Sequence, residues 1–165
     1  MSELEKQIAQ LAERLAGKLQ QQSMTLAVAE SCTGGWLAKV LTDLSGSSAW
    51  FLGGVVSYSN AAKHNVLRVE CDCLDKYGAV SEPVAKQMVA GVGALFSSSL
   101  AVSITGVAGP SGGTLEKPVG MVCFAVINET GNVSVVTKQF AGDRQQVRLQ
   151  AVVAALQLLL DEMGD

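Results

Sequence analysis

The sequence predicts a three-layer α/β/α sandwich built on a mixed, mostly parallel sheet of about five strands. Two observations lead to this fold class. Short apolar runs with β-branched members alternate with segments of helical periodicity through the first two thirds of the chain. Two further apolar runs then flank Glu129-Thr-Gly131, a hairpin signal that adds one antiparallel strand, and a long helical segment follows.

The first elements are expected in the order helix, strand, turn, helix. Apolar residues recur every three or four positions from Leu4 to Leu19, which predicts an amphipathic helix over one edge or face of the sheet. Met24–Ala29 is a short apolar run typical of a buried central strand. Glu30–Gly35 is the expected strand-to-helix turn, and a helix is predicted from about Thr33 to Asp43.

The middle of the chain repeats this pattern. Gly53-Gly54 indicates a bulge or a close backbone approach in the second strand, and Gly91 and Gly93 indicate close packing of a helix. Asn60 is the predicted N-cap of a short helix that carries Lys63. The predicted strands are Ala49–Ser59 and Leu100–Ile104, and the predicted helical segments are the one after Asn60, Asp72–Tyr77 and Ser81–Phe96.

The last elements are the hairpin and a long helix. The hairpin strands are predicted at Val119–Asn128 and Asn132–Phe140, and the helix at Gly142–Met163. Arg144 and Arg148 stand near the start of this helix, four residues apart.

Length and composition limit the class of protein. The 165 residues predict a single domain, residues 1–165, with 48% hydrophobic residues, 16% charged residues and a net charge of −3. No basic block and no apolar run of about 18 residues appears, so neither nucleic acid nor a membrane is the expected partner. The charged first residues do not resemble an export signal, so we expect a cytoplasmic protein with reduced cysteines.

Metal binding is not expected. Cys71-Asp-Cys73 lacks the second Cys or His pair that would complete four ligands.

Three segments of unusual composition follow predicted strands and are expected to meet at one edge of the sheet. They are Ser31–Gly35, Tyr58–Lys63 and Thr105–Gly113. Ligands of open α/β sheets bind beyond the carboxyl ends of the strands. The turn-rich stretch from Thr105 to Val119 is also longer than most loops in compact domains, which favours a functional loop over a tolerated insertion.

These segments hold the candidate catalytic groups. Ser31, Cys32 and Thr105 are candidate nucleophiles. The only histidine, His64, has no obvious acid to orient it, so Lys63 is the better base if burial lowers its pKa. Tyr58 could relay a proton or hold the substrate.

Alternatives remain open for each of these groups. A helix N-terminus lowers a thiol pKa, which keeps Cys32 as a competing nucleophile. Lys63 could instead be solvated and Tyr58 a core residue.

Backbone N–H groups near Thr33 to Gly35, or at Gly106, could stabilise an oxyanion. In the plainer interpretation, Ser31 or Thr33 merely caps the following helix. The glycine-rich loop, the helix after Ser31, Lys117 and the two arginines could bind a phosphate, although the loop is not a P-loop. The residues predicted to contact the substrate are Thr33, Gly34, Gly35, Thr105, Gly106, Gly112, Gly113, Arg144 and Arg148.

Five stretches resemble the C-terminal domain family of the competence/damage-inducible protein CinA, whose stand-alone members are nicotinamide-nucleotide amidases. The stretches are AESCTGGWLAKVLTDLSGSSAWF (29–51), VSYSNAAKHNVLRV (56–69), YGAVSEPVAKQM (77–88), SITGVAGPSGGTLEKPVG (103–120) and FAGDRQQVRLQAV (140–152). By position, the family's serine corresponds to Ser31, its tyrosine and lysine to Tyr58 and Lys63, and its threonine or serine before Gly-x-Ala-Gly-Pro to Thr105.

The resemblance implies hydrolysis of the carboxamide of nicotinamide mononucleotide to nicotinate mononucleotide and ammonia, within pyridine-nucleotide salvage. It implies a small-molecule nucleotide substrate and no metal or other cofactor. Amphipathic helices at both ends are compatible with a homodimer.

Two positions depart from the family pattern. Ser111 stands where the family commonly has aspartate, and Met121 where it commonly has threonine. A paralogue that binds a nucleotide or a protein partner without hydrolysis is therefore the alternative function.

Overall fold

Five strands form one sheet in the order β2-β1-β3-β4-β5 in the computed structural model, which describes residues 1–164. The strands are β1 (Leu26–Glu30), β2 (Phe51–Val56), β3 (Leu100–Gly106), β4 (Met121–Ile127) and β5 (Val133–Gln139). β2, β1 and β3 pair in parallel, while β4 runs antiparallel to both β3 and β5. The predicted mixed sheet with a single reversed strand is therefore confirmed for the described residues.

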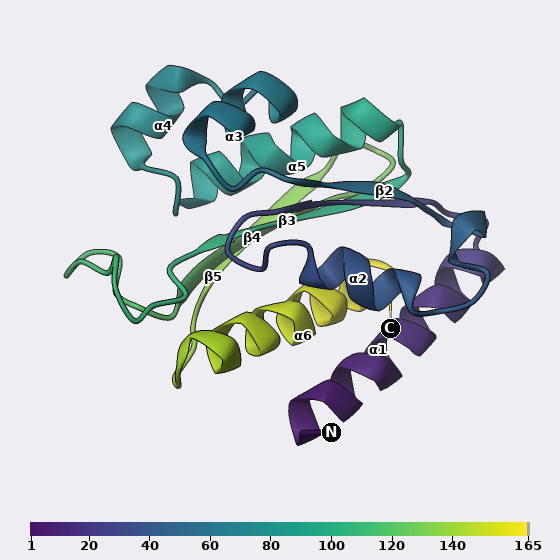
Figure 1. The fold of residues 1–165 in the computed structure, drawn as a ribbon. Coiled ribbons are helices and arrows are strands. Elements are labelled where there is room, and N and C mark those ends of the chain that lie inside the picture. Colours follow the sequence, from purple (N-terminus) through teal and green to yellow (C-terminus); the bar gives the residue numbers. More distant parts are fainter. Residues whose placement is uncertain (165) are drawn as a thin grey trace.

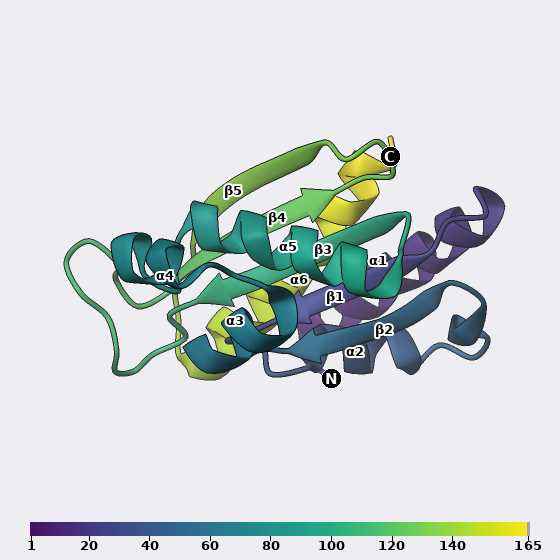
Figure 2. The same ribbon diagram turned by 90° about the horizontal axis from the view of Figure 1, so that it is seen from above.

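Helices cover both faces of this sheet, which confirms the three layers (Figure 1). The helices are α1 (Glu3–Gln21), α2 (Trp36–Thr42), α3 (Asn60–Leu67), α4 (Cys71–Tyr77), α5 (Glu82–Phe96) and α6 (Arg144–Glu162), with a short 3₁₀ turn at Ser47–Ala49. α1, α2 and α6 form one outer layer. α5 lies across the other face, and α3 and α4 flank it, as the view from above shows (Figure 2).

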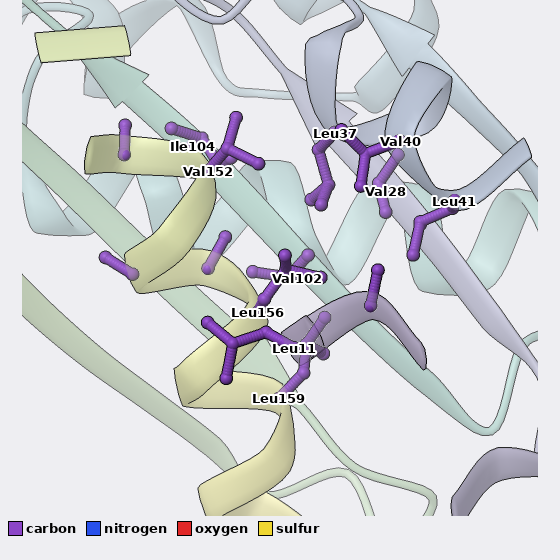
Figure 3. Packing of buried hydrophobic residues seen from close by; sticks show 14 of the residues in the cluster. Leu11, Val28, Leu37, Val40, Leu41, Val102, Ile104, Val152, Leu156 and Leu159 are labelled. Carbon is purple, nitrogen blue, oxygen red and sulfur yellow. The ribbon is translucent and has the colours of Figure 1, made fainter. Parts of the chain in front are cut away.

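The two sides of the sheet carry side chains of different size. Toward α1, α2 and α6, β1 and β3 present large residues such as Val28, Val102 and Ile104, and these interdigitate with leucines of the helices (Figure 3). Toward α5, the same strands present Ala27, Ala29 and Ala101 instead. Because alternate residues of a strand face opposite sides, the small residues let α5 approach the sheet closely.

Several predicted boundaries shift. β1 is Leu26–Glu30 rather than Met24–Ala29, so Glu30 is part of the strand. α2 begins at Trp36 rather than Thr33, because Gly34 and Gly35 adopt φ values of 61° and 94° that interrupt the helix.

At α3 the cap is Ser59 rather than Asn60, since its hydroxyl accepts a hydrogen bond from the Ala62 N–H. The register between β1 and β2 shifts at Leu52, next to the predicted glycine pair, and Gly54 makes a close approach to Val28 of β1. None of the helices in the described chain is long and apolar enough to span a membrane.

We predict that Gly91→Ala destabilises the protein by about 1–3 kcal/mol, because a Cβ there would lie 2.0 Å from the Leu67 carbonyl oxygen. Gly17→Ala is the matched control. It lies in the exposed interior of α1 with nothing within 4 Å of the added carbon, so the free energy of unfolding should rise by up to about 1 kcal/mol. Urea unfolding measures both changes. Equal stability of the two variants would contradict the close α3–α5 packing.

Candidate active site

A cavity of about 290 Å³ opens at the carboxyl ends of the three parallel strands. It lies where the turn after β1, the connection from β2 into α3 and the loop after β3 meet, as predicted. The start of α6 and the connection between α4 and α5 complete its wall. The lining residues are Ser31, Cys32, Tyr58, Lys63, Ala79, Val80, Thr105, Gly106, Val107, Ala108, Gly109, Ser111, Gly112 and Arg144.

Ser31 and Lys63 form the central polar contact of this cavity. The Lys63 Nζ lies 2.9 Å from the Ser31 Oγ, although the two residues are 32 positions apart in the chain. Nζ also donates to the backbone carbonyl of Ser57 at 2.7 Å and approaches that of Tyr58 at 3.4 Å. The whole Lys63 residue is 1% exposed. The predicted serine and lysine are therefore brought together in a buried contact.

Burial lowers the pKa of Lys63, because removal from water penalises the charged ammonium. Its three oxygen neighbours are also compatible with the neutral amine. Two N–H groups can donate to the two carbonyl oxygens while the lone pair accepts the Ser31 hydroxyl proton. The pair can thus act as nucleophile and base.

The N-terminus of α2 is not free, which corrects one prediction. The buried carboxylate of Glu30 accepts hydrogen bonds from the N–H groups of Gly35 (3.1 Å), Leu37 (3.1 Å) and Ala38 (2.8 Å), and from the Thr33 hydroxyl (2.6 Å). The cap is thus neither Ser31 nor Thr33. The predicted contact residues Thr33, Gly34 and Gly35 do not line the cavity, and the N–H groups of Gly34 and Gly35 donate to the Ser31 carbonyl and to Glu30.

The two arginines of α6 lie in different places, although both were predicted to contact the substrate. Arg144 lines the cavity, where Nη1 donates to the Gly109 carbonyl at 2.7 Å and Nη2 to the Tyr58 hydroxyl at 3.2 Å. Arg148 lies behind the cavity and donates to the carbonyls of Cys32 and Thr33. The structure therefore does not bring Arg148 to the cavity with Arg144, because its guanidinium donates to backbone carbonyls.

Tyr58 and Thr105 line the cavity with their hydroxyls already engaged. Tyr58 is 61% exposed, and its phenol meets Arg144 rather than Lys63. This geometry favours substrate contact over proton relay. The Thr105 hydroxyl donates to the Ala79 carbonyl at 2.8 Å, which makes it a poor nucleophile.

Only some glycines of the loop between β3 and β4 line the cavity. Gly106 and Gly112 line the cavity, whereas Gly113 packs against the backbone of Val119. Lys117, a candidate phosphate ligand, donates instead to the carbonyl of Tyr77. Ser111 lines the cavity, and Met121 opens β4 partly buried.

The sequence analysis missed the apolar side of the cavity. Ala79, Val80, Val107 and Ala108 belong to it, and their small apolar side chains carry no sequence signal of a binding role. His64 is exposed, and its Nδ1 lies 2.8 Å from the Val69 carbonyl oxygen.

The cysteines do not supply a reactive thiolate at the cavity. Cys32 is 6% exposed, and burial raises the pKa of its thiol to about 12. Burial outweighs the expected lowering, and the nearby Glu30 carboxylate raises the pKa of this thiol further. Within the described residues, no group of three or more His, Cys, Asp or Glu side chains is placed to hold a metal ion.

The chain is similar to several known proteins. The model of the CinA C-terminal domain family matches residues 8–163. The chain is 48% identical to nicotinamide-nucleotide amidohydrolase PncC of Enterobacter agglomerans, over 96% of each chain, and 48% identical to that of Escherichia coli K12, over 93% of each. The crystal structure of competence/damage inducible protein CihA from Agrobacterium tumefaciens superposes with a TM-score of 0.92 at 38% identity, over 96% of each chain.

We predict that iodoacetamide at pH 8 labels Cys71 well before Cys32 in the native protein. Cys71 is exposed, whereas Cys32 is buried with its pKa raised to about 12, so only a minute fraction of Cys32 is thiolate. Peptide mapping by mass spectrometry measures the two rates, and urea-unfolded protein is the control in which both should react. Faster labelling of Cys32 would restore it as a candidate nucleophile.

Proposed function

The chain belongs to the CinA C-terminal domain family, and on this basis we propose that it hydrolyses nicotinamide mononucleotide with Ser31 as nucleophile and Lys63 as base. The products are nicotinate mononucleotide and ammonia. The relatives named nicotinamide-nucleotide amidohydrolase support the reaction. The contact of 2.9 Å between the Ser31 Oγ and the Lys63 Nζ carries the mechanism.

In the first step, neutral Lys63 takes the Ser31 proton while Oγ attacks the carboxamide carbon. A tetrahedral intermediate forms with a negative charge on the former carbonyl oxygen. The protonated Lys63 then gives its proton to the leaving nitrogen, and ammonia departs. Water activated by the neutral amine hydrolyses the acyl-enzyme and regenerates the Ser31 hydroxyl.

The Gly106 N–H is the proposed donor to this oxyanion. Val107 donates to Met121 on β4, and consecutive N–H groups of a strand point to opposite sides. The Gly106 N–H therefore points away from β4, toward the end of β1 where Ser31 lies. A side chain at Gly106 would lie 2.7 Å from Val122, which favours glycine at this position.

Arg144 is the proposed ligand of the substrate phosphate. It stands at the cavity wall with N–H groups beyond the two that hold Gly109 and Tyr58, and its charge suits an anionic group. The backbone around Gly112 offers further donors. Tyr58 lies beside this arginine and would contact the same end of the substrate.

We also propose a domain organisation, a cellular location and an oligomeric state for this chain. The chain functions as one domain, since both helical layers pack on the same sheet. Free cysteines fit the reducing cytoplasm. The amphipathic helices at both ends of the chain support a homodimer.

We predict that Ser31→Ala lowers the release of ammonia by about 10³-fold or more while the melting temperature stays within a few degrees. The alanine removes the attacking oxygen and little else. Ser45→Ala, at an exposed position, is the matched control and should retain full activity. Undiminished turnover by Ser31→Ala would sink the serine mechanism.

We predict that kcat rises with pH along a limb set by Lys63, since only the neutral amine can accept the Ser31 proton. Burial lowers the pKa of Lys63, so this limb should fall below the ordinary lysine value of about 10.4. Lys63→Met should lose at least about 10²-fold in kcat at every pH. An identical pH limb in the residual activity of that variant would assign the titration to another group.

A further inference from the structure

The turn that carries Ser31 is held by two charged side chains that do not face the cavity. We infer that Glu30 and Arg148 are positioning residues of the hydrolysis, and that they hold the turn after Ser31 through its hydrogen-bond donors and its carbonyl acceptors, respectively. The inference rests on the proposed function of Ser31. It gives Arg148 a role different from the phosphate contact predicted from the sequence.

Glu30 holds the donors of this segment. It immediately precedes Ser31 at the end of β1, and its residue is 1% exposed. Four hydrogen bonds of 2.6–3.1 Å tie its two oxygens to Thr33 and to the first turn of α2. Hydrogen bonds to a buried carboxylate are stronger than neutral ones and restrict its geometry. The direction in which α2 leaves β1 is therefore set by the residue next to the nucleophile.

Arg148 holds the acceptors of the same segment. Its Nε donates to the Cys32 carbonyl at 3.0 Å and its Nη2 to the Thr33 carbonyl at 3.1 Å. The guanidinium also lies 5.1 Å from the ring centroid of Trp36, the first residue of α2. The guanidinium also lies against Gly34, where an added Cβ would be 3.4 Å from Nη2.

These contacts bear on Ser31 because the turn has few other backbone anchors. Ser31 donates to Ile104 of β3, and its own carbonyl accepts from Gly34 within the turn. Without Arg148, the Cys32 carbonyl would lose a charged donor in a buried setting, and the turn would move to recover one. A small displacement of a nucleophile from its base lowers kcat strongly, while substrate contacts on the opposite wall persist.

The test compares four variants by kcat, KM and melting temperature with nicotinamide mononucleotide. Arg148→Met removes the N–H donors but keeps an apolar side chain of similar length. Arg148→Lys retains the positive charge but has one ammonium group in place of the guanidinium. Glu30→Gln keeps the shape but replaces one acceptor oxygen with an N–H₂ group. Leu159→Ala is the control, because it opens a cavity in α6 eleven residues from Arg148 and destabilises the fold away from the site.

A second readout is independent of the nucleotide. The rate at which a small fluorophosphonate modifies Ser31, followed by mass spectrometry, reports the reactivity of the serine alone. A phosphate-binding role of Arg148 would leave this rate unchanged.

We expect Arg148→Met and Glu30→Gln to lower kcat by about 10- to 100-fold and the labelling rate of Ser31 by a similar factor, with KM changed by less than about threefold. Arg148→Lys should be intermediate, and it carries the test of Arg148 should Arg148→Met fail to fold. Leu159→Ala should lower the melting temperature as much while kcat stays within about twofold.

Four other results would count against one or both proposals. The positioning role is overturned if the Arg148 and Glu30 variants have the same kcat as Leu159→Ala. It is also overturned if they raise KM while kcat and the labelling rate of Ser31 stay unchanged. A wild-type protein that releases no ammonia but is labelled at Ser31 refutes the proposed substrate, and the labelling rates still decide the role of Glu30 and Arg148. A wild-type protein that is neither active nor labelled refutes both proposals.

Discussion

The burial of one lysine beside a serine is the constraint that the rest of the site has to satisfy. Burial removes the Lys63 ammonium from water and destabilises its charged form, so its pKa lies below that of a solvated lysine. The unfolded chain holds its proton to a higher pH than the folded one. Between the two pKa values the unfolded state binds more protons, so stability rises with pH there, and below the folded-state pKa the native protein bears the full cost of a buried charge. A surface serine–lysine contact would avoid this cost but would leave the amine protonated.

The fold meets this constraint by bringing three strand ends to one edge. β1 delivers Ser31, β2 leads into the helix that delivers Lys63, and β3 ends at Gly106 in the opposite wall. The small residues on the α5 face and the glycines of α5 let the helical layer carrying α3 settle close to the sheet. Stability and chemistry therefore share the same packing, since a shift of α3 would separate the amine from the hydroxyl.

Much of the site could be predicted from the sequence because its residues directly follow recognisable strands. Ser31, Lys63, Gly106 and Arg144 all line the cavity as expected. The errors concern groups whose partners are backbone atoms. Glu30 takes the Gly35 N–H, one of the donors predicted for an oxyanion, and Arg148 donates to carbonyls of the turn. A sequence pattern shows which groups could bind an anion. It does not show whether those groups already form hydrogen bonds within the protein.

The sequence by itself determined the order of the elements, the reversed strand after the hairpin and the edge of the sheet at which the polar segments gather. These features depend on local periodicity, turn chemistry and the short connections of α/β folds. Only the tertiary structure decided the lowered pKa of Lys63, the raised pKa of Cys32 and the separate positions of Arg144 and Arg148. Each of these depends on burial and on hydrogen-bond partners far away in the chain. The Ser31–Lys63 contact spans 32 positions and the Arg148–Cys32 contact 116, distances over which local sequence carries no information about which atoms will meet.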